Sequence, residues 1–396
     1  MNRILKKLVP GVLAAALALG AVPSGITFDD ILASADGGSV KIEGLSLTVD
    51  SSYGLNCYVS LSDGLSASDV SVVYHTPNAG TDETVVTTEK LPSPTTLDSN
   101  TVYKITVPVY PKHYDKTATL QFKNGDTVCD LKYSDNTDVT DDVLSTTVKA
   151  YLANIEDNYD KIESGDSADK LYDLAHALKL YGQYTQYYFA NKSKTSGTYE
   201  KVEWWTKTGA PTTAGWMTNL GITGDMNSWL NNSSSKAPTV SYDPSWTGGT
   251  QYQGSVSYSV ALVLDEDIKA RFYYVNWLET STPWIQLFKN ESQINGSLTS
   301  YPDLNDESGH RKYVETSGIN IGYLTDEYDF RIHRSYDSGA TSYYDHLYVS
   351  PVGYAKAIVI TLASGDHVTK YEYNGLANAM RAMVVADWAA KQYFGI

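Results

Sequence analysis

The sequence predicts a mostly β, α+β protein with two tandem β-sandwich-like (Ig-like) domains, each closed by a C-terminal amphipathic helix. Three observations predict this fold class. The composition is rich in tyrosine, with 32 Tyr and 8 Trp against 7 Phe, and tyrosine suits half-buried strands. About seven short strand patterns lie between residues 46 and 133, as in a small sandwich. A helical pattern at residues 171–189 returns at residues 376–394.

The helical pattern at residues 171–189 places apolar or small side chains at the i, i+3, i+4, i+7 spacing of one helix face. These positions are Leu171, Leu174, Ala175, Leu178, Gly182, Thr185 and Phe189. Aligned without gaps, Leu376, Ala382, Tyr393 and Phe394 fall on identical residues of the first stretch. We therefore expect two equivalent helices.

The first residues have the pattern of a secretory signal peptide, which we assign to residues 1–35. Arg3, Lys6 and Lys7 precede an apolar run at residues 8–22, the order found in exported proteins. Residues 33–35 form a small-residue cleavage site, with Ala21 as a rival. A retained membrane anchor is the alternative, although glycines and a proline interrupt the run. We expect a secreted, extracellular protein, or one held at the cell surface, with no membrane association after cleavage.

The charge balance is acidic, with 46 Asp and Glu against 30 Lys and Arg. Without a cluster of basic residues that could follow phosphates, nucleic acid is excluded as a partner. Acidity of this kind serves solubility. We expect a monomer without a cofactor.

The first domain is assigned to residues 36–190. Residues 46–59 are expected to form two strands about a turn at residues 50–54. Further strands are expected at residues 70–74, 84–88, 103–109, 117–122 and 128–133. Asn-Gly-Asp at residues 124–126 is the strongest hairpin signal. Two antiparallel helices should follow, the first capped by Thr140 and the second starting at Gly-Asp-Ser, residues 165–167.

A connector is assigned to residues 191–257, where Ser, Thr, Gly, Asn and Pro dominate. It also carries Trp204, Trp205, Trp216, Trp229 and Trp246. Disordered linkers seldom hold so many large aromatic residues. We therefore expect it to be partly ordered against one or both domains.

Residues 258–396 are predicted to be a degenerate second copy of the first domain. Residues 261–275 align without gaps on residues 46–60, with Leu262 on Leu47 and Tyr273 on Tyr58. Further along, residues 358–362 align on the strand at 118–122, and residues 365–368 align on the turn at 125–128. Residue 376 aligns with Leu171 in the second helix of the first copy and follows residue 368 closely. The second copy is therefore expected to lack the first of the two helices.

The pattern Y-G-x-x-x-Q-x-Y-F at residues 181–189, following a β-domain that opens on S-L-x-V-D, resembles a module of secreted and cell-surface proteins of gut Firmicutes. Those modules end in a sequence close to A-L-L-N-Y-G-A-A-A-Q-x-Y-F. The resemblance covers most of residues 40–190 and, more faintly, 258–395, where Ala386, Asp387 and Lys391 replace the Tyr, Gly and Gln. It implies an extracellular setting and brings no established activity or catalytic residue.

Four patterns have residue types found in catalytic or metal sites, and a structural role is favoured for each. The histidines at 75, 113, 176, 310, 333, 346 and 367 are scattered without zinc-ligand spacing. The Gly-Asp-Ser of residues 165–167 is similar to the start of some esterases but lies between two helices. Glu279 and Glu315, in similar contexts, could pair as acid and base. Residues 303–309 alternate oxygen ligands like a calcium loop, but Ser308 stands where the loop needs glycine. We expect no catalytic residue and no metal.

Cys57 and Cys129 are the only cysteines. An even number in an exported chain predicts a disulfide between them. Two buried thiols are the alternative.

The aromatic residues carry the functional hypothesis. Flat aromatic rings stack on the apolar faces of sugars, and Trp277, Trp284, Tyr273 and Tyr274 are the best cluster on a predicted folded element. The alternative is that these rings fill the core. We expect a secreted, non-enzymatic interaction module that binds carbohydrate or a cell-wall or surface protein. The alternatives are an extracellular hydrolase, either a glycoside hydrolase or an esterase, and a purely structural surface protein.

Overall fold

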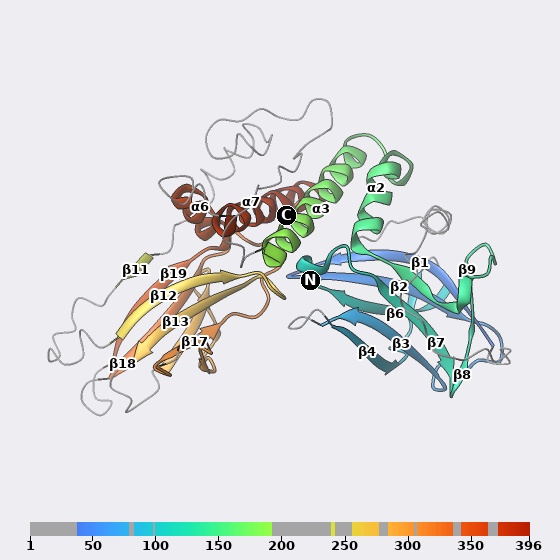
Figure 1. Ribbon diagram of the computed structural model, residues 1–396, viewed down its shortest axis with the longest axis horizontal. Helices are drawn as coiled ribbons and strands as arrows, with labels where there is room; N and C mark the ends of the chain where they lie inside the picture. The colour runs from blue at the N-terminus through green and yellow to red at the C-terminus, as the bar shows by residue number, and fades with distance from the viewer. Residues whose placement is uncertain are drawn as a thin grey trace. The chain divides into compact units, whose positions relative to one another are not determined.

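The computed structural model describes residues 38–78, 83–97, 100–191, 239–241, 256–276, 284–304, 306, 308–335, 342–362 and 371–396 (Figure 1). The predictions for the signal peptide, for the tryptophans of the connector and for Trp277 lie outside these residues. The chain divides into two compact units. Unit 1 comprises Met1–Gln186 with Gln392–Gly395, and unit 2 comprises Tyr187–Lys391 with Ile396. Strands and antiparallel pairing dominate both, so the prediction of a mostly β, α+β protein is confirmed.

Unit 1 contains two β-sheets. The first has the strand order β5-β6-β2-β1-β9, made of Thr95–Leu97, Asn100–Val109, Tyr53–Leu61, Ser39–Val49 and Asp130–Tyr133. The second has the order β10-β7-β3-β4, made of Leu144–Thr146, Ala118–Asn124, Val70–Pro77 and Thr84–Lys90, with β8 (Thr127–Val128) paired to β7. In β3, Val70, Val72 and Tyr74 are buried while their neighbours are half-exposed. This period of two is the reason the segment forms a strand with one face in the core.

The hairpin predicted at residues 124–126 is confirmed. Asn124 pairs with Thr127 across the turn between β7 and β8, and Gly125 adopts a φ of +60°. Glycine adopts positive φ without steric cost, which is why it suits this turn.

The first helix begins later than the sequence analysis predicts. Thr140 lies in a short 3-10 turn, Thr140–Asp142, in which Asp141 is left-handed, and it caps no α-helix. Residues Leu144–Thr146 form β10, because Leu144 pairs with Leu120 of β7. Helix α2 (Val148–Ile162) is capped instead by Thr147, whose side chain accepts from the Ala150 N–H at 2.9 Å. The predicted cap was wrong because Leu144–Thr146, which the apolar pattern assigned to a helix, pairs with β7 and adopts an extended conformation.

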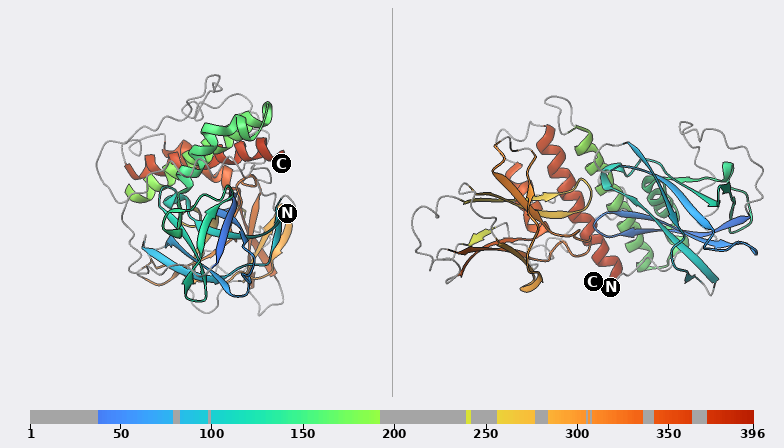
Figure 2. Two further views of the ribbon diagram at one scale, coloured as in Figure 1. Left: turned by 90° about the vertical axis from the view of Figure 1, so that its right-hand side faces the viewer. Right: turned by 90° about the horizontal axis from the view of Figure 1, so that it is seen from below.

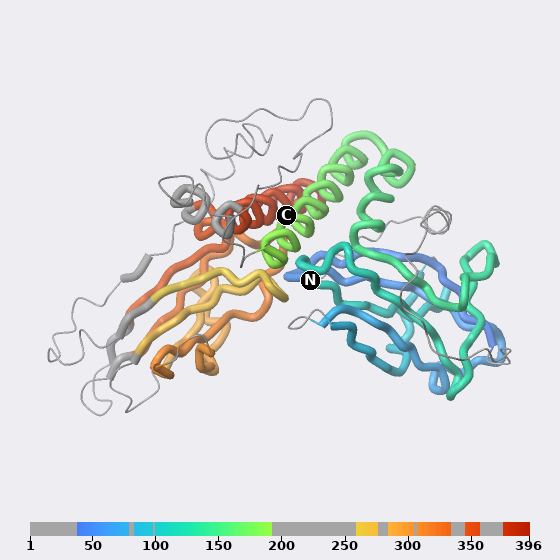
Figure 3. Tube along the Cα trace, viewed as in Figure 1, coloured from blue at the N-terminus to red at the C-terminus, as the bar shows by residue number. Residues whose placement is uncertain are grey.

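Helix α3 (Asp166–Asn191) contains the residues of the predicted helix at 171–189. The Gly-Asp-Ser motif lies at its start, with Gly165 at a φ of +60° in the turn after α2. The two helices follow the strands of unit 1 along the chain path traced in Figure 3. Their facing sides share a buried carboxylate, Glu156, which accepts from His176 Nδ1 at 2.6 Å and also binds Lys179. Burial alone would raise the pKa of Glu156, but the hydrogen bonds from His176 and Lys179 outweigh it and lower that pKa.

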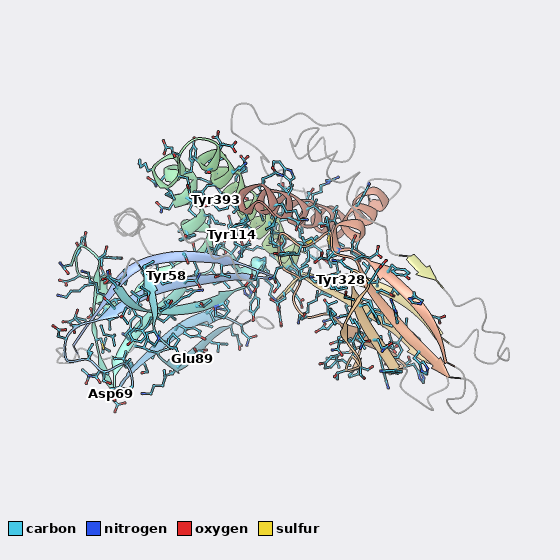
Figure 4. The ribbon with its side chains drawn as sticks, turned by 180° about the vertical axis from the view of Figure 1, so that it is seen from behind. Tyr58, Asp69, Glu89, Tyr114, Tyr328 and Tyr393 are labelled. Atoms are coloured by element: carbon cyan, nitrogen blue, oxygen red, sulfur yellow. The ribbon has the colours of Figure 1, made fainter. Side chains whose placement is uncertain are left out.

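The Tyr-Gly-x-x-x-Gln motif attaches α3 to the rest of unit 1. The Tyr181 ring meets Tyr53 edge-on at 6.2 Å, and the Tyr53 hydroxyl donates to the Leu178 carbonyl at 2.7 Å. A Cβ placed on Gly182 would lie 2.6 Å from the ring of Tyr114, which is labelled in Figure 4. The motif therefore reflects close packing of this helix.

Gln186, the last position of that motif, donates through its side-chain amide to Asp115. Asp115 follows directly after Tyr114 in the chain. Positions 182 and 186 of α3 thus contact neighbouring residues of one loop.

Among its described residues, unit 2 also contains two sheets and two helices. One sheet has the order β12-β13-β17-β16, made of Val256–Val263, Lys269–Asn276, Arg311–Glu315 and Tyr301–Pro302. The other has the order β11-β19-β18-β14-β15, made of Thr239–Ser241, Ser342–Val349, Tyr328–Ser335, Trp284–Lys289 and Ser292–Asn295. Helices α6 (Pro351–Leu362) and α7 (Tyr371–Phe394) follow (Figure 1). Phe272 of one sheet stacks on Phe330 of the other at 5.6 Å, and both are fully buried.

The strands of the two units follow the same order. The neighbouring strands in the two sheets of unit 1 are β5-β6-β2-β1 and β4-β3-β7-β10. The corresponding strands in the two sheets of unit 2 are β16-β17-β13-β12 and β15-β14-β18-β19. The first hairpins also agree in register. Thr48 pairs with Gly54, and Val263 pairs with Lys269, the residues that the ungapped alignment places on them.

The later part of that alignment was wrong. Residues 358–362 were aligned on a strand, but they belong to helix α6. In strand order the place of β7 is taken by β18, and α6 precedes α7 as α2 precedes α3. The prediction that the second copy lacks the first of the two helices was therefore wrong. The error arose because an apolar run of this length fits a buried strand and a buried helix equally well.

At the motif positions, α7 uses polar contacts where α3 uses close packing. Asp387, aligned with Gly182, is fully buried and accepts from the N–H groups of Gly322 at 2.7 Å and Leu324 at 2.9 Å. Lys391, aligned with Gln186, lies 3.4 Å from Asp387 Oδ2 and donates to Thr325 at 2.7 Å. Burial raises the pKa of Asp387, and Lys391 and the two N–H groups oppose that rise.

The predicted disulfide does not form, because Cys57 and Cys129 lie far apart and are not joined. Cys57 pairs with Leu45 of β1, whereas Asp130, next to Cys129, pairs with Ser39 six positions earlier on β1. Six strand residues span about 20 Å, and a disulfide needs Cα atoms within about 7 Å. Both thiols are buried in unit 1.

We expect the two thiols to be unreactive in the folded chain. Burial raises the pKa of Cys57 to about 12 and that of Cys129 to about 11, so little thiolate exists at pH 8. Alkylation at that pH should be slow before unfolding and should modify two thiols per chain after unfolding without reductant. Fewer than two thiols in the unfolded, unreduced chain would contradict this arrangement.

Candidate binding face

The structure separates the predicted aromatic cluster. Tyr273 and Tyr274 lie on β13, in one sheet of unit 2, whereas Trp284 begins β14 in the other sheet. Trp277 lies outside the described residues. Because Tyr273 and Tyr274 are consecutive in a strand, their side chains also point to opposite faces. The three described members of the predicted cluster therefore do not form one site.

Tyr274 belongs to the core of unit 2. Its side chain is buried, it stacks on Phe272 at 5.9 Å, and its hydroxyl donates to Ser300 Oγ at 2.7 Å. Its assignment to a binding site is corrected, because a buried ring cannot stack on a ligand from solvent.

Tyr273 lies on the opposite face of the same sheet, next to Tyr313 at 5.7 Å. Tyr313 is also 5.5 Å from Tyr301, and the guanidinium of Arg271 covers its ring at 4.1 Å. Arg271 in turn donates to Glu315 at 2.7 Å. The Tyr273 and Tyr313 rings contact each other, and Arg271 covers Tyr313, which favours a role of these two rings in stabilising the sheet.

Glu315 is paired with basic side chains in this arrangement. In addition to Arg271, Lys269 binds it at 3.3 Å, and the second glutamate of the hypothetical pair, Glu279, lies outside the described residues. The acidic loop at residues 303–309 is similarly occupied by protein groups. Asp303 pairs with Arg311, and Asp306 accepts from Ser308 and from the Arg311 N–H. In the described part of the chain, no group of three or more His, Cys, Asp or Glu residues could hold a metal.

Trp284 is 44% exposed and is held in a fixed position. Its indole N–H donates to the Gly296 carbonyl at 2.7 Å. The ring of His333, directly opposite on β18, meets the indole edge-on at 5.2 Å. Trp284 therefore presents a large ring that needs no further ordering to receive a ligand.

Polar and aromatic side chains continue from Trp284 across three strands on the outer side of this sheet. Register places Gln286, Arg331 and His346 in one row and Phe288, Asp329 and Tyr348 in the next. The alternate residues, among them Ile285, Leu287, Phe330, Ile332 and Leu347, are buried in the core. We call this surface the β14–β18–β19 face; its described members are Trp284, Gln286, Phe288, Asp329, Arg331, His333, His346 and Tyr348.

Asp329 organises the polar part of the face. Only 6% of its side chain is exposed, and it accepts from Arg331 Nε at 2.7 Å and from His346 Nδ1 at 3.0 Å. Arg331 lies over the Phe288 ring at 3.4 Å, and His346 stacks on Tyr348 at 5.7 Å. One buried carboxylate thus fixes a guanidinium and an imidazole, and two aromatic rings support them.

That Asp329, Arg331 and His346 lie together was not predicted from the sequence, in which His333 and His346 are only two of the scattered histidines. A signal was present in β18, where Asp329, Arg331 and His333 alternate with Phe330 and Ile332. Such alternation predicts a strand with a polar outer face, but it does not show which strands lie beside it.

In comparisons with known proteins, no family model, curated protein or solved structure matches the chain. The resemblance to the Firmicutes module therefore stays a prediction. Among the described residues, no helix combines the length and the apolar character needed to cross a membrane.

Proposed function

We propose that the chain is an extracellular, non-enzymatic binding module that binds carbohydrate at the β14–β18–β19 face. The observation that carries the proposal is the exposed, fixed ring of Trp284 beside the hydrogen-bonding groups around Asp329. Sugar recognition requires both an aromatic surface for the apolar ring face and polar groups for the hydroxyls.

The arrangement of the face supports this assignment. Trp284 supplies the aromatic surface, and Gln286, Arg331 and His346 form a row of polar side chains directly beside it on three adjacent strands. Arg331 and His346 are ordered before a ligand arrives, since Asp329 and the rings of Phe288 and Tyr348 hold them. Preorganisation reduces the entropy lost on binding.

Export would bring this face into contact with extracellular glycans. The pattern of residues 1–35 and the resemblance to secreted Firmicutes modules both favour that location. The proposal includes a monomer that needs no cofactor.

We further propose that the two units arose by duplication of one Ig-like β-sandwich closed by a C-terminal helix. The shared strand order and the shared register of the first hairpins support a common origin. The domain assignment, residues 36–190 and 258–396 with a connector between them, follows from this view.

Replacing Trp284 by alanine should abolish carbohydrate binding and leave most of the stability in place. The ring is partly exposed, so its removal should cost about 1 kcal/mol, mainly the hydrogen bond to Gly296. A buried tryptophan would instead cost about 3–5 kcal/mol. Binding of the full chain to immobilised cellulose, xylan, pectin, chitin, peptidoglycan and mucin, together with thermal melting, measures both effects.

The matched control is Tyr301→Ala, because Tyr301 is also 44% exposed but lies on the other sheet of unit 2. It should keep binding. The proposal is wrong if the wild-type chain binds none of these polysaccharides, or if both variants bind as wild type does.

A further inference from the structure

Arg331 is positioned as an anion-binding residue. Its Nε donates to Asp329 at 2.7 Å, and its guanidinium lies over the Phe288 ring at 3.4 Å. Guanidinium carries five N–H donors, and the contact with Asp329 uses the one on Nε. The two terminal nitrogens carry the other four donors, in a plane that Asp329 and Phe288 hold in place.

The charge of the β14–β18–β19 face contrasts with that of the whole chain. The sequence has a formal net charge of −16. On the described side chains of this face, one arginine and two histidines accompany a single carboxylate, Asp329, which is buried beneath its partners. With the histidines counted as neutral, Arg331 and Asp329 balance, so this face lacks the negative charge of the whole chain and is where an anionic partner meets least repulsion.

The distance from Trp284 to Arg331 suits one sugar residue. Trp284 pairs with His333, and Arg331 lies two positions before His333 on the same strand. Such diagonal neighbours are about 7–8 Å apart. A sugar ring stacked on Trp284 can therefore place a substituent on Arg331.

We propose, on the basis of the carbohydrate-binding function above, that the ligand is a sugar carrying a carboxylate, such as a uronic acid residue of a polysaccharide. Trp284 stacks on the sugar ring, and the two terminal nitrogens of Arg331 bind the carboxylate. A planar guanidinium matches a planar carboxylate through two parallel hydrogen bonds. Phosphate and sulfate esters can accept the same pair of hydrogen bonds, so the experiment includes a sulfated polysaccharide.

The test compares ligands that differ only in the anionic group. Oligogalacturonate and its fully methyl-esterified form are titrated into the full chain by calorimetry, with dextran sulfate as a third ligand. We expect the free acid to bind at least tenfold more tightly than the ester, and this difference to shrink as salt is raised. Equal affinity for acid and ester, or tighter binding of dextran sulfate than of the acid, would overturn the carboxylate assignment and leave carbohydrate binding intact. Failure of every glycan would instead refute the proposed function itself.

Two variants of Arg331 separate charge from geometry. Arg331→Gln should weaken acid binding at least tenfold and should weaken ester binding by a clearly smaller factor. Arg331→Lys keeps a positive charge beside Asp329, so it protects the fold, and it should still weaken acid binding because lysine lacks the planar fork. The control is Arg311→Gln, since Arg311 is also paired with an aspartate and lies 6.0 Å from the Tyr273 ring on the other sheet. The proposal fails if Arg331→Lys, while folded, binds the acid as wild type does, or if Arg311→Gln weakens it equally.

Discussion

Replacing Asp387 by alanine should destabilise unit 2 by about 2–5 kcal/mol. The carboxylate accepts from the N–H groups of Gly322 and Leu324 in a fully buried position. Each buried N–H left without an acceptor costs about 1–3 kcal/mol. Lys391 would also lose the carboxylate that lies 3.4 Å from its ammonium group. Chemical unfolding and hydrogen exchange of the Gly322 and Leu324 amides measure the loss.

Asp387→Asn is the matched control for this prediction. The asparagine oxygen can still accept from the two N–H groups, and asparagine carries no charge that burial would penalise, the effect that raises the pKa of Asp387. We therefore expect a loss below about 1 kcal/mol and nearly normal protection of the two amides. Equal losses for the alanine and asparagine variants would show that the backbone hydrogen bonds do not account for the stability of this contact.

Replacing Gly182 by leucine should destabilise unit 1 by about 3 kcal/mol or more. Leucine is a much better helix former than glycine, so helix propensity alone predicts a gain. The Cβ would instead meet three carbon atoms of Tyr114 at 2.6–2.8 Å, a separation that forces the packed ring to move. Overpacking of this kind usually costs about 1–3 kcal/mol for smaller changes. The midpoint of chemical unfolding reports the sign and size of the effect.

A second substitution tests whether Tyr114 causes this loss. In a chain that already carries Tyr114→Gly, all three of these clashing atoms are absent, and the leucine should cost much less than it does alone. The difference is the coupling free energy of a double-mutant cycle. A coupling near zero would mean that the ring of Tyr114 is not the obstacle.

Local features of the sequence determined several elements of this protein. The apolar period at residues 171–189 predicted a helix that the structure extends to Asp166–Asn191. The alternating residues on both sides of residue 50 predicted the hairpin of β1 and β2, and the Asn-Gly turn predicted that of β7 and β8. These elements depend on side-chain period and on the φ angle of a turn glycine, both of which are local properties.

Tertiary structure decided the features that depend on partners distant in the chain. Leu144 became part of a strand because β7 offered it a pairing edge, although its apolar pattern suits a helix. Cys57 and Cys129 both lie in unit 1, yet the register of β1 with β2 and β9 separates them along the sheet.

The candidate binding face also depends partly on local sequence and partly on tertiary structure. The alternation in β18 is a local property of the sequence, but the exposure of Trp284 and the β14–β18–β19 face itself exist only because those strands pair in one register. That pairing brings Trp284, Asp329 and His346 onto one surface, and it places Tyr273 and Tyr274 in the other sheet. Hydrogen bonds between strands and burial of the alternate side chains select the register, and both depend on residues that are far apart in the sequence.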